Sequence, residues 1–257
     1  MSKLSYFSLL FMIIFLAGCR KDDDPILPKQ KDLKVQFVAE YDGKPLIFNS
    51  LLNYEFNSYL KLSRLDYFIS DLALMSSKDT ILLRDIGYLD FTKTNRDEAT
   101  AANGVVWTIK DVPVGDYNAL RMGIGVNPKL NATKPADYPS THRLSNLELY
   151  WAGWNSYIFS RMEGKIDTLS TGLFATGFTY HTGMNNVYRE VNLQSAMKID
   201  PTVENNTITI HLDVKKLFSS PEGWLDILEI QEAHGPGDMA TVLKIVNNYA
   251  TAFSIKK

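Results

Sequence analysis

Apolar and polar side chains alternate along most of the chain from residue 33 onward. The clearest case is residues 207–214, in which Ile208, Ile210, Leu212 and Val214 alternate with polar residues. A period of two predicts a strand with one face in the core. Strands are likewise predicted for six further segments: residues 34–39, 66–75, 80–83, 105–109, 119–126 and 187–193. Turn residues separate these segments, so the pattern predicts an all-β fold, an antiparallel β-sandwich.

Helical periodicity is scarce. Residues 215–218 predict one helical turn, and residues 241–249 place Val242, Ile245 and Tyr249 on one helix face. We therefore expect few short helices and a single β-sandwich domain over residues 33–257.

Two adjacent segments break the strand pattern. Residues 127–147 form a long stretch that contains three prolines, and a loop of this length is usually functional or mobile. Residues 149–159 follow and hold Trp151, Trp154, two tyrosines and a phenylalanine. These aromatics have two interpretations: they fill the core, or they form a binding surface that stacks a ligand or sets an indole beside a metal.

The N-terminus has the pattern of an export signal. Lys3 precedes an apolar run over residues 9–16, which is too short to span a bilayer comfortably. Leu16-Ala17-Gly18-Cys19 resembles a lipobox, so residues 1–18 are predicted to be a signal peptide and Cys19 the lipidated first residue. The alternative is an ordinary signal peptide with an incidental cysteine.

A charged linker is predicted for residues 19–32. Lys21 is followed by three aspartates, which resembles the surface-export signal of Bacteroidota lipoproteins. With Cys19 as a lipid anchor, this predicts an outer-membrane protein displayed on the cell surface. The periplasmic face is the alternative location.

Charge and motifs narrow the function classes. The chain has 27 basic and 29 acidic side chains, a net charge of −2, which disfavours nucleic acid as a partner. Cys19 is the only cysteine, so the mature domain offers no disulfide, thiolate ligand or cysteine nucleophile. The sequence has no Gly-x-Ser-x-Gly, His-Glu-x-x-His, P-loop or dinucleotide-binding pattern. We therefore expect a protein that is not an enzyme.

Histidine is rare, with four residues in the chain. His181 ends a predicted strand and His234 lies in a Gly-rich loop, so a metal site would need distant segments to converge. Met184 and Met239 follow these histidines closely, and imidazole with thioether suits copper. The alternative for both methionines is gap-filling in the core. His211 is expected on the solvent-exposed face of its strand.

Four segments occur in the order of a known family. They are Tyr67-Phe68-Ile69-Ser70-Asp71-Leu72, Met122-Gly123-Ile124-Gly125-Val126-Asn127, the aromatic stretch up to Glu163-Gly164, and Tyr180-His181-Thr182-Gly183. Together they resemble the MbnP-like copper-binding domain, whose lipid-anchored members are common in Bacteroidota. The resemblance covers the chain from about residue 33 to the C-terminus.

The resemblance implies a β-sandwich with a mononuclear copper site. His181 matches the family's His-x-Gly, and Trp151 and Trp154 fall in its aromatic stretch. Some relatives carry a Trp-derived kynurenine made by a di-haem peroxidase-like partner enzyme. His234 joins the candidate ligands on chemistry alone.

Two functions stay open. The first is a lipid-anchored, copper-binding β-sandwich for storage, uptake or delivery. The second is a metal-free cell-surface module that binds a glycan, peptide or partner protein. A close approach of His181 to His234 would favour the first, and a wide separation the second.

Overall fold

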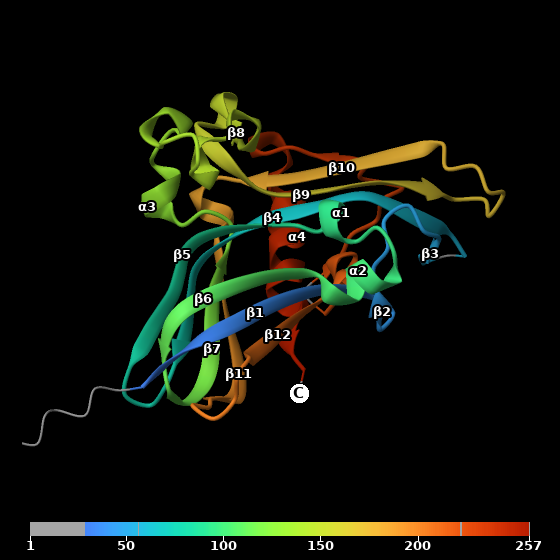
Figure 1. The fold of residues 1–257 in the computed structure, drawn as a ribbon. Coiled ribbons are helices and arrows are strands. Elements are labelled where there is room, and N and C mark those ends of the chain that lie inside the picture. Colours follow the sequence, from blue (N-terminus) through green and yellow to red (C-terminus); the bar gives the residue numbers. More distant parts are fainter. Residues whose placement is uncertain (1–28, 56, 222, 257) are drawn as a thin grey trace, which may run out of the picture.

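Two β-sheets and one long C-terminal helix make up the molecule (Figure 1). The structure is a computed structural model that describes residues 29–256 except 56 and 222. The predicted signal peptide, Cys19 and most of the predicted linker lie outside the described residues.

The first sheet is built around β1 (Gln30–Tyr41). It pairs with β6 (Val105–Pro113) on one side and β12 (Asn206–Asp213) on the other, and its end pairs with β2 (Lys44–Pro45). β16 (Phe253–Ile255) lies beyond β12. Leu33, Val35 and Phe37 of β1 point into the core and are buried, as the alternation predicts.

The second sheet is larger and is built around β4 (Tyr59–Met75). Its strand order is β11 (Arg189–Ile199), β7 (Gly115–Ile124), β4, β9 (Ser156–Asp167), β10 (Thr176–Gly183) and β15 (Glu232–Ala233). The strands β3 (Leu52–Asn53) and β5 (Thr80–Asp90) also pair with β4, and β8 (Tyr150–Trp151) pairs with β9. A small pair, β13 (Ser219–Ser220) and β14 (Gly223–Trp224), stands apart.

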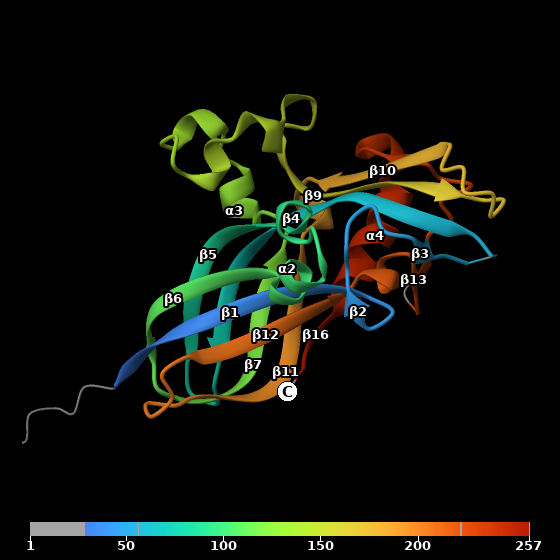
Figure 2. The ribbon, with the colours of Figure 1, turned by 45° about the vertical axis from the view of Figure 1, so that its right-hand side comes forward.

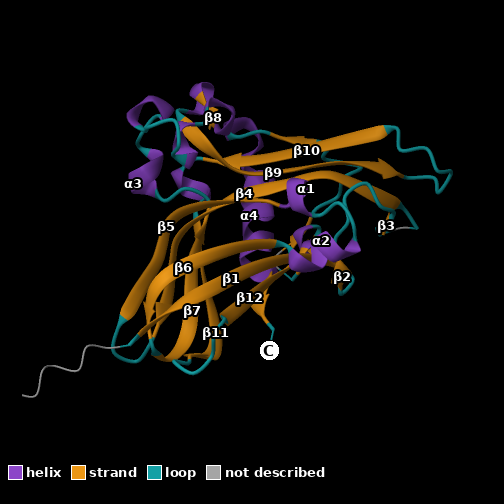
Figure 3. Cartoon of the chain, in the orientation of Figure 1, coloured by secondary structure: helices purple, strands orange, loops and turns teal. Residues whose placement is uncertain are grey.

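The expected all-β sandwich is confirmed, with strands dominating over helices in Figure 3. All seven predicted strand segments fall on observed strands. Two pairs differ from the antiparallel expectation, because β1–β12 and β10–β15 are parallel. A period of two shows which face is buried but carries no information on strand direction.

One helix carries the predicted apolar face. It is α4 (Met239–Ala252), which buries Val242, Ile245 and Tyr249. The Tyr249 ring packs edge-on against Tyr67 of β4, with centroids 5.6 Å apart. Figure 2 shows α4 behind the second sheet. The described residues contain no helix with the length and apolar character needed to cross a membrane.

The remaining helices are short. They are α1 (Phe91–Thr94), α2 (Glu98–Asn103), α3 (Pro128–Asn131), η1 (Pro135–Asp137), η2 (Arg143–Ser145), η3 (Leu147–Leu149), η4 (Ala152–Trp154), η5 (Asn185–Val187), η6 (Val214–Leu217) and η7 (Pro236–Asp238).

The stretch with three prolines, residues 127–147, is called the Pro-rich segment below, and it folds mainly as the short helices α3 to η3 over one end of the second sheet (Figure 1). Asn131 attaches it to the sheet and is almost fully buried. Its Oδ1 accepts hydrogen bonds from the Tyr157 N–H at 2.9 Å and from Ser156 Oγ at 3.1 Å. Its Nδ2 donates to Asn185 at 2.9 Å. The segment is therefore tied to both β9 and η5.

Candidate functional site

His181 and His234 lie side by side although they are far apart in sequence. β10 and β15 run parallel, with Thr179 opposite Glu232 and Tyr180 opposite Ala233. The next residues along the two strands are His181 and His234. Their ring centroids are 5.0 Å apart, and the rings are nearly perpendicular, with an interplanar angle of 79°.

Two tryptophans form a wall beside these histidines. Trp151 and Trp154 stack with centroids 4.3 Å apart at 18°, and Trp151 meets the His234 ring edge-on at 5.8 Å. Trp151 is 37% exposed, so the wall is open to solvent. Neither earlier interpretation of the aromatic segment holds throughout. Tyr157 and Phe159 fill the core, whereas the two tryptophans form a surface.

Two glycines make room for the Trp154 indole. A Cβ on Gly235 would lie 2.5 Å from Trp154 Cε2, and one on Gly183 would lie 2.8 Å from Cε3. Gly235 also has φ +114°, which side chains rarely adopt. Each glycine is within two residues of a candidate histidine, so the chain at both histidines packs directly on the indole.

Glu163 is a site residue that the sequence reasoning missed. Its Oε1 lies 3.0 Å from His181 Nε2, because residues 163 and 181 point to the same face of the adjacent strands β9 and β10. Burial acts to raise the pKa of Glu163, but hydrogen bonds from His181 and Arg64 outweigh it and hold this pKa below its usual value. The signal in the sequence that could have identified Glu163 is its place before Gly164, at the end of the stretch that resembles the family.

The protonation of His181 follows from its surroundings. Burial lowers the pKa of His181 and outweighs the opposing effect of Glu163, while nearby His234 and Arg161 lower it further. The ring is therefore neutral at pH 7 and carries one N–H. Because the ionised Glu163 can only accept, that N–H is on Nε2, and Nδ1 keeps a free lone pair.

An ion-pair network extends from Glu163 across the sheet. Arg64 bonds Glu163 at 2.9 Å and lies 3.7 Å from Asp66. Arg161 bonds Asp66 at 2.9 Å and donates to the Tyr88 hydroxyl at 2.8 Å. Glu163 is thus held from two sides, by His181 and by Arg64.

The two candidate methionines lie near the histidines in sequence but make other contacts. Met184 donates its N–H to Ser156 Oγ at 2.8 Å, and Met239 Sδ accepts a hydrogen bond from Asn186 Nδ2 at 3.3 Å. Their part in binding a metal stays a prediction.

The other two histidines lie elsewhere. The expectation that His211 is solvent-exposed was wrong: it is half-buried, and its Nδ1 lies 2.7 Å from Glu40 Oε1. The neighbouring strand supplies a carboxylate that the alternation pattern of one strand cannot reveal. His142 stacks on Tyr138 in the Pro-rich segment.

The donor set narrows the metals that could bind. Within the described residues, no three or more His, Cys, Asp and Glu side chains are grouped as a metal site. A structural zinc site normally takes four such ligands. Two imidazoles whose centres are 5.0 Å apart can both reach one ion at metal–nitrogen bonds of about 2 Å. Imidazole ligands, with thioethers nearby in sequence, fit copper.

The fold and this site define an all-β sandwich protein with a surface histidine pair beside stacked indoles. The chain belongs to the MbnP family: the family model MbnP matches residues 30–235, which include both histidines and both tryptophans. This family is associated with copper. The fold is similar to that of the solved structure "MbnP from Methylosinus trichosporium", with 15% identity, 82% of each chain covered and a TM-score of 0.50. No curated protein matches the chain in sequence.

Proposed function

We propose that this protein binds copper as cargo, for storage, uptake or delivery, and is not an enzyme. The observation that carries the proposal is the pair of imidazoles, His181 and His234, placed 5.0 Å apart beside an indole wall. Because His181 is neutral at pH 7, it binds a cation without first losing a proton. Membership in a copper-associated family supports the same assignment.

Each neighbour of the pair has a separate task in this proposal. Glu163 holds the Nε2–H of His181, so His181 binds through Nδ1. Trp151, stacked on Trp154, lies against one side of the His234 ring and limits access of water to the ion from that side. Met184 and Met239 are the candidate thioether ligands, which favour the cuprous state.

Titration with cuprous ion under reducing conditions tests this function. The chain from Lys21 onward is titrated against a chromophoric chelator. We expect binding by the wild type and at least a tenfold weaker affinity for His181→Ala and His234→Ala. His142→Ala, a histidine outside the site, is the matched control and keeps the wild-type affinity. Wild-type binding no tighter than that of a control protein rejects the proposal.

The rival function, a metal-free binding module, makes the opposite prediction. Trp151→Ala would then abolish ligand binding, while copper would make no difference. The close approach of His181 and His234 favours copper over this rival.

We further propose that Cys19 carries the lipid anchor and that the protein is displayed on the outer membrane. The lipobox-like sequence and the lysine–aspartate linker support this. Incorporation of labelled palmitate should be lost in Cys19→Ala. Digestion of intact cells by a protease should remove the protein if it faces outward and spare it if it faces the periplasm.

A partner enzyme of the di-haem peroxidase-like class is also part of the proposal, because some relatives carry a Trp-derived kynurenine. The Trp151 side chain is exposed, so a modifying enzyme has access to it. Mass spectrometry of the protein from its own host should show the mass change on the peptide that holds Trp151 and Trp154. An unmodified peptide in copper-loaded protein contradicts the partner.

A further inference from the structure

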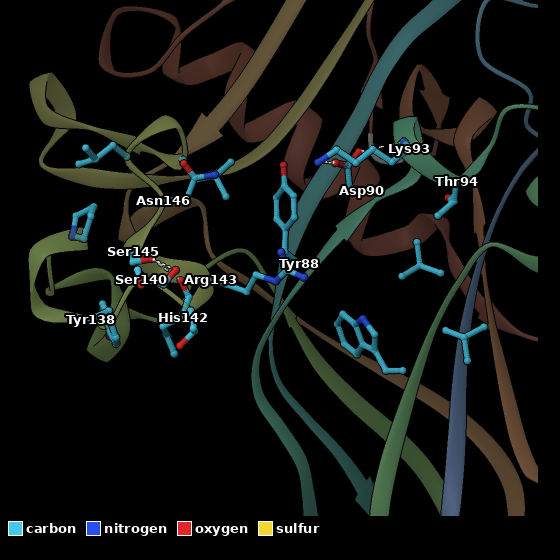
Figure 4. A pocket seen from close by; sticks show the side chains of 17 residues that line it. Tyr88, Asp90, Lys93, Thr94, Tyr138, Ser140, His142, Arg143, Ser145 and Asn146 are labelled. Carbon is cyan, nitrogen blue, oxygen red and sulfur yellow. Dashed lines mark hydrogen bonds and ion pairs between the residues drawn. The ribbon is translucent and has the colours of Figure 1, made fainter.

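A hollow that includes neither His181 nor His234 lies elsewhere on the molecule (Figure 4). It is a groove of about 1070 Å³ between the Pro-rich segment and the strands β5 and β6. Ligand pockets typically measure about 300–1,000 Å³, so the groove has room for a ligand of several rings.

The charges lining the groove are mainly positive. Arg143 is exposed, and its side chain makes no ion pair within the described part of the chain. Lys93 lies opposite and pairs with Asp90, the one acidic residue among those that line it, at 3.0 Å. Arg84 does not line the groove, but its guanidinium lies 4.7 Å from the ring centroid of Trp107, which does. The formal charge of the lining is positive although the whole chain is at −2.

Seven of the uncharged residues that line the groove carry a neutral hydroxyl or amide group. These are the hydroxyls and the amide of Tyr88, Thr94, Tyr138, Ser140, Thr141, Ser145 and Asn146. Both walls carry them, and Figure 4 shows Tyr88 between the two walls. The hydroxyls of Ser140 and Thr141 and the Nδ2 of Asn146 make no hydrogen bond within the described part of the chain, so a lipid or another purely apolar ligand would cover them without giving them partners, which is costly. The matching ligand is itself rich in hydroxyl groups.

The side of the groove formed by the Pro-rich segment is a braced wall: its own hydrogen bonds and ring stacking hold it in place without a ligand. Ser145 Oγ donates to the carbonyl of His142 at 2.7 Å. Tyr138 and His142 stack with centroids 4.2 Å apart and rings 7° from parallel. Asn146 Oδ1 caps η3 by accepting the Glu148 N–H at 3.0 Å. A braced wall lowers the entropy cost of binding.

We propose that this groove binds an acidic oligosaccharide. Arg143 pairs with a carboxylate of the sugar, since a guanidinium matches a carboxylate with two parallel hydrogen bonds. Lys93 provides a second contact, and the hydroxyl and amide side chains bind the sugar hydroxyls. The charge of the ligand is low, at one or two negative charges, because Asp90 repels denser anions such as polyphosphates.

This site is independent of the proposed copper function. Its nearest link to the histidines is Tyr88, whose hydroxyl accepts from Arg161 in the ion-pair network. None of the residues that line the groove is a candidate metal ligand. Sugar binding is therefore expected to be the same with and without copper.

Calorimetric titration of the full chain with four probes tests the proposal. The probes are tetragalacturonate, neutral maltotetraose of the same length, a tetrapeptide of glutamate, and inorganic triphosphate. We expect tetragalacturonate to bind best, and more weakly at high salt because its ion pairs are screened. Arg143→Gln should lower its affinity at least tenfold, as expected for loss of a hydrogen bond between charged groups. Lys129→Gln, an exposed lysine of the same segment outside the groove, should leave the affinity unchanged.

The other outcomes each overturn the assignment. Binding of neutral maltotetraose with the same affinity as tetragalacturonate rejects a role for the charge of the sugar. Tighter binding of the peptide or of triphosphate rejects the ligand class. Wild-type affinity in Arg143→Gln, checked by circular dichroism to be folded, rejects the groove as the site, and no binding of tetragalacturonate rejects the proposal as a whole.

Discussion

Glu163 is the single side chain on which the geometry of His181 most depends. Its Oε1 contacts His181 Nε2 at 3.0 Å, so it sets both the rotamer and the tautomer of the ring. We expect Glu163→Gln to weaken copper binding by about ten- to a hundredfold, the usual cost of losing the carboxylate behind a metal-binding histidine. Competition with a cuprous chelator measures this change.

The neighbour Lys165 supplies the control for Glu163. It is exposed and lies two residues along the same strand, so Lys165→Gln should bind copper as the wild type does. Nitrogen-15 shifts of His181 in the copper-free protein give a readout that needs no metal. The variant for this readout is Glu163→Leu, because a glutamine amide oxygen could still accept from Nε2, and a ring still protonated only on Nε2 in Glu163→Leu would contradict the positioning role.

Gly235 is the residue that allows the indole wall to form. In Gly235→Ala, the new Cβ would lie 2.5 Å from Trp154, and the backbone would keep a strained φ of +114°. We expect a loss of about 1–3 kcal/mol in the free energy of unfolding and an altered near-ultraviolet circular dichroism of the stacked indoles. Gly237→Ala is the matched control, because nothing lies within 4 Å of its Cβ position. A wild-type dichroism spectrum in Gly235→Ala would contradict the packing.

Among elements, strands were predictable and their partners were not. The alternation in residues 207–214 reports burial on one face, which is a local property of the sequence. β15 has only two residues, Glu232–Ala233, and no period can be recognised in so short a strand. Yet its pairing with β10 is what brings His234 to His181. The two histidines could be proposed from residue type alone, but their distance required the register of these strands.

One carboxylate adds a side-chain link between the first sheet and the residue that follows its edge strand β16, which also pairs with β12. Glu40 of β1 accepts hydrogen bonds from His211 of β12 and from Lys256, which follows β16. Burial acts to raise the pKa of Glu40, but these bonds outweigh it and lower the pKa below its ordinary value of 4.5. Because the folded pKa is the lower one, ionised Glu40 stabilises the protein above about pH 4.5, and this is lost as the pH falls through the folded pKa.

Replacing Glu40 tests this contribution. Glu40→Gln should lower the free energy of unfolding by about 1–2 kcal/mol at pH 7, and the difference from the wild type should shrink towards pH 3. Urea unfolding at pH 7, 5 and 3 measures it. Asp32→Asn, which removes a pair between exposed side chains on the other side of β1, should show little effect at any of these pH values. A deficit for Glu40→Gln that is independent of pH would contradict the role of the charge.

Across the whole molecule, the sequence was most informative about the site where the residue type is rare in the chain. Histidine and tryptophan are rare in this chain, and the positions singled out, His181, His234, Trp151 and Trp154, lie together. Carboxylates are common, so residue type alone did not distinguish Glu163 from the other 28 acidic residues, and only its place before Gly164 in the family-like stretch pointed to it. The groove at Arg143 joins β5, β6 and the Pro-rich segment, and no local pattern describes such a meeting of distant segments.

The ion pair between Asp66 and Arg161 links the neighbouring strands β4 and β9 of the second sheet. Asp66 is 2% exposed, and its Oδ1 lies 2.9 Å from Arg161 Nε. Burial raises the pKa of Asp66, and the hydrogen bond from Arg161 opposes this rise. Removing the Asp66 charge leaves the Arg161 guanidinium, 15% exposed, without its ion-pair partner, so Asp66→Asn should cost about 3–5 kcal/mol in the free energy of unfolding. In the double variant Asp66→Asn with Arg161→Gln no unpaired charge remains, so its loss should be smaller than the sum of the two single losses. Urea unfolding of all four proteins measures the coupling, and strictly additive losses would show that the pair makes no joint contribution.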